Sequence, residues 1–368
     1  MQVTIEKKDV RDTIAKVNQL KRGCLRGMST FIIEAKDLGE KSTATITGIN
    51  PSIRTVVTVP ANVKELGSAM FSLDSPVGEV MTAFSGDITL QTIGENIKVS
   101  SGADSEAIVV QVAKKEWMDA VGQDANTVTV KLNKTAFFDA IGKTAFVCRG
   151  EPMGELTNAI ALKFDEGKTT IMSTDRKRIC MLVLPVGIEK PQTVILSEES
   201  VGILEKTLGD GEEMTLDISD KMVTARSGNT ATSVPRMVIN FPELEGLLPK
   251  AYECVVTVPR VAFLDSLKTA SIGNKEAILL QFGDQIVVTT TSAELGKIVK
   301  RHDIHVDKTF SALFRPSYLI EPMEAQTTEQ VNLRFVSTSG VAPITISGDP
   351  SYVYMVMPMT NPGTAKPA

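Results

Sequence analysis

The sequence predicts an α+β protein in which one two-helix, many-stranded unit occurs three times in tandem. Two observations carry this prediction. A short β-rich stretch followed by an amphipathic helix begins near Val3, Val128 and Val255, and a second helix with alternating strands follows inside each copy. The period is roughly 125 residues, whereas solenoid repeats are about 20–50 residues long. Each copy is therefore large enough to fold around a core of its own.

The first helix of each copy is expected over residues 8–20, 133–147 and 259–271. Apolar residues recur there with the i, i+3, i+4 and i+7 spacing that places them on one helix face. The aligned residues are Val10, Ile14 and Val17, then Phe137, Ile141 and Ala145, then Leu264, Leu267 and Ala270.

A second helix is expected in each copy, near residues 75–84, 198–208 and 316–325. Ser75 and Pro76 are the residue types of an N-cap and a first-turn proline. Pro322 falls inside the third of these helices and should kink or shorten it. Strands surround the helices, with hairpin turns at residues 165–167 and 283–284.

The repeats predict three domains, at residues 1–122, 123–251 and 252–360. Residues 361–368 are polar and contain two prolines, which is typical of a disordered tail. Three tandem units of this kind suggest a rotationally repeated object that closes on itself or closes by dimerising.

The composition is that of a soluble globular protein, with 42% hydrophobic and 23% charged residues. No apolar run approaches the roughly 18–20 residues that span a bilayer, so no membrane partner is expected. The four cysteines are scattered, which favours a reducing cytoplasm. The formal net charge of −5 argues weakly against a surface that holds nucleic acid everywhere. Lys and Arg gathered on one face would still attract phosphates.

Sequence patterns of phosphate-binding loops and serine hydrolases are absent from the chain. His302 and His305 are its only histidines, and without a nearby cysteine they make a poor metal set. We therefore expect no catalysis, no cofactor and no metal. Two other possibilities stay open. One is an enzyme with an active site between repeats, and the other is a structural repeat protein that does not bind DNA.

Three strings, in this order within the repeat, resemble the beta subunit of bacterial DNA polymerase III, the beta sliding clamp family. They are Thr-Asp-Arg-Lys-Arg-Ile at 174–179, Asn-Phe-Pro-Glu-Leu-Glu-Gly-Leu-Leu-Pro at 240–249, and Tyr-Met-Val-Met-Pro-Met at 354–359. Phe-Arg-Pro-Ser-Tyr-Leu-Ile-Glu at 314–321 is similar to a further segment of that family. The resemblance covers essentially the whole chain up to Thr360.

The resemblance implies a DNA clamp fold, with two helices and two antiparallel sheets in each domain. It also implies a head-to-tail homodimer that closes into a ring. Helices line the hole, and double-stranded DNA passes through it without sequence readout. DNA polymerase and the clamp loader dock through short peptide motifs in a groove between domains 2 and 3. The protein is then a processivity factor without enzymatic activity.

The groove that the resemblance implies combines apolar and polar side chains. Its residues are Leu156 or Thr157, Thr174, Arg176, Arg178, Ile179, Pro242, Leu247, Met355 and Met357. Methionines suit an adaptable peptide-binding surface, and the alternative is that Met355 and Met357 are core residues of a last strand. Arg176 and Lys177 stand where the family usually has glycine and histidine, and Gly246 where arginine is common. We therefore expect one wall to be more basic and the other more open.

Cations recur in the loop after the first helix of each copy. Arg22 and Arg26 lie in the first loop, Arg149 in the second and Lys275 in the third, and we expect them to face DNA. Further cations lie on or beside the expected lining helices: Lys7, Lys8, Arg11, Lys16, Lys134, Lys143, Arg260 and Lys268. For any single cation the alternative is an ordinary solvated surface charge.

A head-to-tail dimer needs two complementary strand edges. Residues 105–112 and 296–304 are the expected pair, because an unpaired apolar edge promotes aggregation. The expected interface residues are Ile108, Val110, Ile272, Lys297 and Lys300. The alternative is that both are ordinary edge strands protected by charge.

Overall fold

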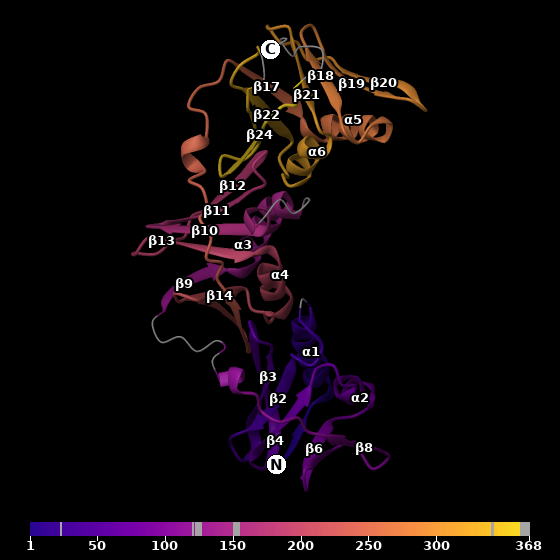
Figure 1. The fold of residues 1–368 in the computed structure, drawn as a ribbon, viewed down its shortest axis with the longest axis vertical. Helices are drawn as coiled ribbons and strands as arrows, with labels where there is room; N and C mark the ends of the chain where they lie inside the picture. The colour runs from indigo at the N-terminus through magenta and orange to yellow at the C-terminus, as the bar shows by residue number, and fades with distance from the viewer. Residues whose placement is uncertain (23, 120, 122–126, 150–154, 340–341, 361–368) are drawn as a thin grey trace. The chain divides into compact units, whose positions relative to one another are not determined.

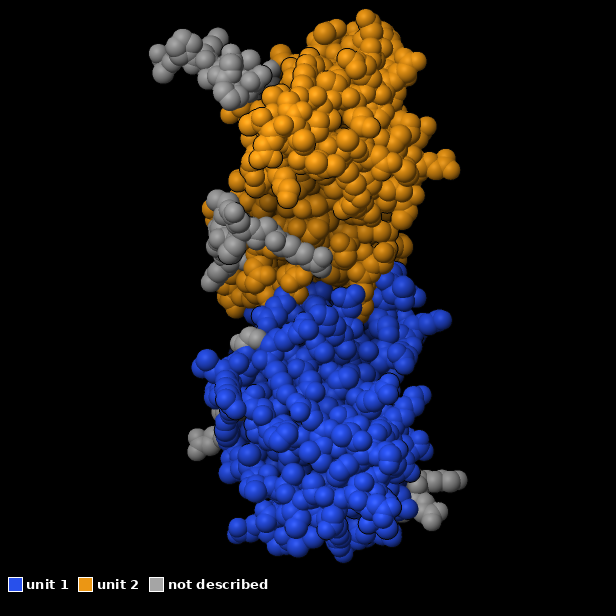
Figure 2. All heavy atoms as spheres, turned by 90° about the vertical axis from the view of Figure 1, so that its right-hand side faces the viewer, with its two compact units in different colours: residues 1–136, 199–236 blue, residues 137–198, 237–368 orange. Residues whose placement is uncertain are grey.

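The computed structural model describes residues 1–22, 24–119, 121, 127–149, 155–339 and 342–360. Figure 1 shows their helices and strands, and they form two compact units, which Figure 2 draws in different colours. Unit 1 comprises residues 1–136 and 199–236, and unit 2 comprises residues 137–198 and 237–368. The expected boundary near residues 120–126 and the expected disordered tail fall almost entirely outside the described residues. The division into three domains therefore stays a prediction.

Unit 1 is built on a 12-stranded sheet whose main path runs β8-β7-β6-β1-β4-β16-β15-β14-β9. Strand β4 pairs with both β1 and β16, so the sheet continues from the first predicted domain into the second. The strands are β1 (Gln2–Ile5), β2 (Thr30–Ala35), β3 (Gly39–Ile49), β4 (Arg54–Glu65), β5 (Gly67–Ser72), β6 (Ile88–Ile93), β7 (Asn96–Ser101), β8 (Ser105–Val110), β9 (Val128–Asn133), β14 (Glu213–Ile218), β15 (Met222–Ser227) and β16 (Thr230–Pro235).

Helices α1 (Lys7–Val17) and α2 (Val77–Ala83) lie side by side on these strands (Figure 1). The predicted apolar stripe of α1 is buried. Helix α1 packs so closely on β3 that a Cβ added to Gly48 would lie only 2.8 Å from the Val17 Cβ. A 3-10 helix η1 (Asn18–Lys21) continues α1, and the other helices here are η2 (Glu116–Asp119) and α4 (Glu198–Thr207).

The expected cap of α2 is wrong in detail. Pro76 itself occupies the N-cap position, without a side-chain cap bond. The Ser75 hydroxyl donates instead to the Ser72 carbonyl at 2.7 Å, inside the turn that precedes the helix. A local side-chain to backbone bond has replaced the predicted cap.

Unit 2 contains two antiparallel sheets, with the orders β13-β10-β11-β12-β24-β23-β22-β17 and β20-β19-β18-β21. Pairing of β12 with β24 joins strands of the second and third predicted domains. The strands are β10 (Ala159–Asp165), β11 (Lys168–Thr174), β12 (Arg178–Leu184), β13 (Gln192–Ser197), β17 (Cys254–Pro259), β18 (Ile278–Phe282), β19 (Ile286–Ser292), β20 (Gly296–His302), β21 (Phe310–Phe314), β22 (Gln330–Phe335), β23 (Ile344–Ser347) and β24 (Tyr352–Val356).

The core of unit 2 packs helices and aromatic rings against these sheets. Helix α5 (Arg260–Gly273) lies against β19, β20 and α6 (Ser317–Glu324), as Figure 1 shows. Phe282 stacks on Phe310 with centroids 4.6 Å apart, and Phe335 meets Phe310 edge-on at 4.8 Å, so the two sheets share one aromatic core. The remaining helices are α3 (Lys134–Ala145), η3 (Phe146–Arg149), η4 (Glu155–Asn158) and η5 (Glu245–Leu247).

Pro322 is buried inside α6, and the helix continues past it to Glu324, so the expected kink or shortening at Pro322 stays a prediction. The predicted apolar stripes of α3 and α5 are buried as well. Among the described residues no helix is both long and apolar enough to cross a membrane.

Candidate partner-binding surface

The turn between β11 and β12 is held together by its own side chains. The Thr174 hydroxyl donates to the Arg178 carbonyl at 2.8 Å and accepts the Arg176 N–H at 3.1 Å. One oxygen of Asp175 accepts the N–H groups of Lys177 and Arg178, both at 3.0 Å. Threonine and aspartate at these places therefore fix the loop shape, which explains why Thr174 is buried rather than offered to a ligand.

Arg176 is the one described non-glycine residue with a positive φ, at 72°. This left-handed conformation costs an L-residue about 1–2 kcal/mol and is ordinarily a glycine position. The backbone therefore explains the glycine that is usual in the family, and it makes arginine the exception. Arg176 and Lys177 are both exposed, and among the described residues neither forms an ion pair.

Arg178 is buried, with 4% of its surface exposed. Its guanidinium pairs with Asp175 at 2.9 Å and with Glu321 of α6, and lies 4.4 Å above the Tyr318 ring centre. Burial alone would lower the pKa of this group, but Tyr354, Glu321 and Asp175 together hold the pKa above its ordinary value. Arg178 therefore stabilises the turn. Its positive charge is already paired with two carboxylates and is not available to a carboxylate of a ligand.

The strand pair β12–β24 carries the apolar part of the surface. Ile179 lies opposite Met355, and the Met357 N–H donates to the Lys177 carbonyl at 3.2 Å. Ile179 belongs to a buried cluster with Leu244, against which Met355 packs. Met357 itself is 42% exposed. Met355 is therefore half-buried against the core cluster, whereas Met357 is exposed and accessible to a ligand.

The segment that follows β16 supplies the other side of this cluster. Leu244 belongs to the cluster, Phe241 and Leu248 pack against it, and Leu247 in η5 is 57% exposed. A Cβ on Gly246 would meet no atom within 4 Å, so the position is open, as expected. We call the apolar residues Ile179, Leu247, Met355 and Met357 the Met357 surface.

A charge pair anchors η5. Lys163 on β10 binds Glu245 and also lies 3.5 Å from Glu243. The hydrogen bond from Lys163 lowers the pKa of the Glu245 carboxyl, and that bond raises the pKa of Lys163. The acidic side chains of this segment are therefore already partnered.

The structure brings most of the expected groove residues into one neighbourhood within unit 2. Thr174, Arg176, Arg178, Ile179, Met355 and Met357 are linked through β11, β12 and β24. Pro242 is half-buried in the segment that carries Leu247. Thr157 is buried, and the side chain of Leu156 lies outside the described residues, so the choice between these two positions stays a prediction.

Sequence reasoning missed the residues that shape this surface from beneath. Leu244 and Phe241 lie inside the quoted 240–249 string, and Tyr318 and Glu321 lie inside the 314–321 string. The available signal was their position in those strings. Their roles depend on contacts between strands and helices far apart in the chain.

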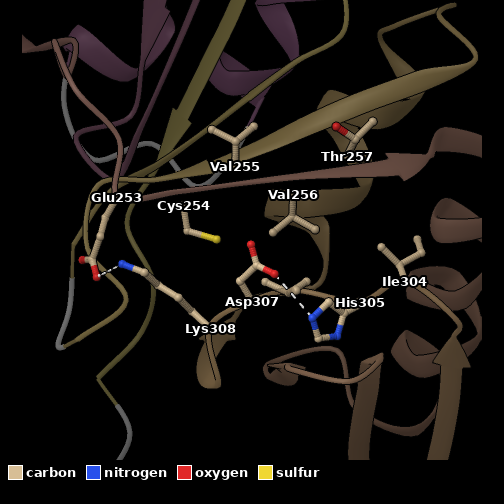
Figure 3. Close-up of a pocket in the computed structure, with 10 residues that line it drawn as sticks. Glu253, Cys254, Val255, Val256, Thr257, Ile304, His305, Asp307 and Lys308 are labelled. Atoms are coloured by element: carbon tan, nitrogen blue, oxygen red, sulfur yellow. Dashed lines mark hydrogen bonds and ion pairs between the residues drawn. The ribbon is translucent and has the colours of Figure 1, made fainter.

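A cavity of about 410 Å³ beside β17 bears on the enzyme alternative. Cys254, His305 and Asp307 line it, an arrangement that invites a nucleophile–base interpretation (Figure 3). Burial raises the pKa of the Cys254 thiol, whereas reactive cysteines have a lowered pKa. Among the described side chains no group of three or more His, Cys, Asp or Glu residues is arranged to hold a metal. The cavity therefore gives the enzyme alternative no support.

Comparisons with known proteins show what the chain is similar to. Residues 245–360 match the family described as DNA polymerase III beta subunit, C-terminal domain. The beta sliding clamp of Pseudomonas putida is 26% identical over 227 residues, which is 59% of this chain and 61% of that protein. The crystal structure of DNA polymerase III subunit beta from Pseudomonas aeruginosa superposes with a TM-score of 0.87 at 17% identity, covering 98% of this chain and 100% of that one.

Residues 245–360 are thus similar to the DNA polymerase III beta subunit family, and the whole chain has the fold of a solved member of that family. The DNA polymerase sliding clamp from Bacillus subtilis has the same fold, with a TM-score of 0.87 at 16% identity over 98% of this chain and 99% of that one. The fold of the whole chain is thus the clamp fold, whereas the sequence match spans about three-fifths of the Pseudomonas putida protein.

Among the described residues the main paths of the three sheets end at strands β8, β9, β13, β17, β20 and β21, and β8 and β20 are the two expected at the dimer interface. Strand β8 ends the sheet of unit 1 and β20 ends the four-stranded sheet of unit 2. Ile108 and Val110 on β8 are 65% and 76% exposed, and Ile272 at the end of α5 is 71% exposed. Lys297 and Lys300 on β20 are exposed too. All five expected interface residues are therefore accessible in the single chain.

The cations expected near DNA divide into two groups. Lys7, Lys16, Lys134 and Arg260 bond to acceptors of the protein itself, and Lys143 and Lys268 form ion pairs. Lys8 and Arg11 on α1, and Arg22, Arg26 and Lys275 just beyond the first helices, are exposed, and no described acid pairs with them. Arg149 ends η3, but its side chain lies outside the described part of the chain.

Proposed function

We propose that this chain is a DNA sliding clamp. Two copies associate head to tail, close into a ring around double-stranded DNA, and hold DNA polymerase and the clamp loader by short peptide motifs. In this proposal the chain has three clamp domains, acts in the cytoplasm as a processivity factor, and catalyses no reaction. The match of residues 245–360 to the DNA polymerase III beta subunit family and the clamp fold of the whole chain support it.

The observation that carries the proposal is the pair of free strand edges at β8 and β20. Exposed apolar side chains on an unpaired edge promote aggregation unless another strand covers them. The β8 edge bears Ile108 and Val110 with the acidic Asp104 beside them, and β20 bears Lys297 and Lys300. Opposite charge at two different edges favours a heterologous contact, which forms a closed ring when the rotation allows it.

The unpaired cations support contact with DNA. A clamp has to slide, so its phosphate contacts need to be loose and independent of sequence. Arg22, Arg26 and Lys275 are exposed and tied to no described partner. Arg22 and Arg26 follow the first helix of the first repeat, and Lys275 follows that of the third repeat. Arg149 holds the corresponding place in the second repeat.

A topological experiment tests the proposal. The protein is incubated with a linear plasmid, which can thread through a closed ring, the ends are ligated into a circle, and the mixture is filtered by size in 0.5 M salt, which weakens phosphate contacts. A ring stays with the circle under these conditions and leaves when a restriction enzyme cuts the circle once. Loss from the circle in salt alone, or equal retention on circular and linear DNA, contradicts the proposal.

The docking part of the proposal rests on the Met357 surface. It is apolar at its centre, open at Leu247 and Met357, and supported by the buried cluster around Leu244. A short peptide that carries leucine or phenylalanine side chains fits such a surface, because methionine adapts to different apolar partners.

A further inference from the structure

We propose that the partner segment held at the Met357 surface is acidic, with carboxylates placed next to its apolar residues. The proposal rests on the function above and names the chemistry of the peptide. It concerns Arg176 and Lys177, which lie at the edge of this surface.

The cations are placed beside the apolar residues by a backbone contact. The Lys177 carbonyl accepts the N–H of Met357, so the turn and the exposed methionine are immediate neighbours. Ile179, two residues further along β12, lies opposite Met355. A peptide that covers Met357 with an apolar side chain therefore brings its adjacent residues to Lys177 and Arg176.

The acids around the turn are already committed to other partners. Asp175 accepts two backbone N–H groups and the Arg178 Nε, and Glu321 pairs with Arg178. Glu243 and Glu245 pair with Lys163. Each of these two acid pairs shares a single cation, so one net negative charge remains beside Arg178 and one beside Lys163, but none of the four acids forms an ion pair with Arg176 or Lys177. The two cations are therefore unpaired among the described residues and can meet an incoming carboxylate.

The backbone conformation of Arg176 supports the same conclusion. This left-handed conformation suits glycine, so an arginine at this position strains the backbone. Residues held in sparsely populated conformations cluster at binding sites. The Asp175 and Thr174 bonds already fix the turn, and the arginine side chain adds nothing to them. Its remaining property is an exposed charge.

A nucleic acid is the other polyanion that two cations attract. The surroundings favour the peptide, because exposed Leu247 and Met357 offer apolar contact, whereas protein surfaces that bind nucleic acid are polar and strongly basic. DNA is therefore kept as an outcome of the test.

The test compares two labelled peptides that differ only in charge, Asp-Leu-Asp-Leu-Phe and Asn-Leu-Asn-Leu-Phe, by fluorescence anisotropy. Each is titrated with the full chain, with the double variant Arg176→Gly plus Lys177→Gln, and with Lys131→Gln as a control. Lys131 is an exposed lysine on β9 in unit 1. Thermal unfolding checks that every variant is folded. Retention on circular DNA is measured for the same three proteins.

We expect the acidic peptide to bind the wild type about three- to tenfold more tightly, as two exposed ion pairs allow. The difference should disappear in the double variant and persist in Lys131→Gln. Equal affinity of both peptides for the wild type overturns the acidic preference and leaves the docking function standing. Binding of neither peptide overturns both. A double variant that keeps the peptide preference and loses DNA assigns the two cations to DNA instead.

Discussion

The guanidinium of Arg178 on β12 pairs with the carboxylate of Glu321 on α6 within unit 2. Arg178 is almost fully buried, and Glu321 is one-third exposed, with 3% and 33% of their side chains accessible. The pair joins residues 143 positions apart and supports the turn that carries Arg176 and Lys177. The Met357 surface therefore depends on a helix that it does not include.

Replacement of Glu321 by glutamine tests this support. We expect the free energy of unfolding to fall by about 1–3 kcal/mol, because a buried charge loses one of its two carboxylates, with Asp175 remaining. Urea denaturation measures the change. Glu324→Gln on the same helix is the matched control, since Glu324 forms an exposed pair with Lys268 and its loss should change stability by less than about 0.5 kcal/mol. Equal effects of the two variants would remove the special role of Glu321.

Arg176→Gly should stabilise the chain. The change removes the left-handed strain of an L-residue, and we expect a gain of about 1 kcal/mol in urea denaturation. Lys177→Gly is the control, because its φ is not positive and glycine there should only add chain entropy to the unfolded state. A loss of stability in Arg176→Gly would show that the arginine side chain holds the turn.

Substitution of Ile179 should mainly lower stability, whereas substitution of Met357 should mainly weaken peptide binding. Ile179→Ala removes a buried side chain and is expected to lower the free energy of unfolding by about 2–4 kcal/mol. Met357→Ala at an open position should change stability by less than about 0.5 kcal/mol. It should nevertheless weaken peptide binding roughly tenfold by anisotropy, as for a contact at the centre of an interface. Unchanged peptide affinity in Met357→Ala would place the docking site elsewhere.

Lowering the pH should reduce the stability of unit 2 through protonation of Glu253. Hydrogen bonds from Lys308 and from the Thr338 side chain and N–H lower the pKa of this carboxyl from 4.5 to about 2. Because the folded pKa is depressed, the contribution to stability is complete above pH 4.5 and is lost as the pH falls toward 2. The urea midpoint of the wild type should therefore fall more steeply over this window than that of Glu253→Gln. Parallel curves would contradict the assignment.

The β8 edge should decide self-association. Ile108→Lys combined with Val110→Lys places two charges on an edge that is expected to pair, and we expect a monomer by sedimentation. Ile93→Lys, at an apolar residue of the same unit that is 46% exposed, serves as the control and should leave the mass unchanged. An unaltered mass in the double variant would move the interface away from β8.

Periodicity was sufficient to predict the helices of this fold. Val10, Ile14 and Val17 repeat with helical spacing, and the structure buries all three. The cap of α2 was wrong because Ser75 bonds to the preceding turn, a choice that spacing does not reveal. Strand order was also beyond the sequence, because β12 meets β24 across about half the chain, and only long-range packing selects that pair.

The sequence predicted which residues lie near the site but not what their side chains do there. Thr174 and Arg178 were expected in the groove, yet their side chains are buried and build the turn. The positive φ at Arg176 is a property of the folded backbone that one sequence does not display. The glycine that the family resemblance places at this position was the available signal.

Ring closure by two copies is the central claim, and the solution mass tests it most directly. Light scattering at micromolar and then at nanomolar concentration should give a mass near twice the 39.7 kDa of one chain, persisting on dilution because the interface covers Ile108 and Val110. A mass of one chain at micromolar concentration would contradict self-closure.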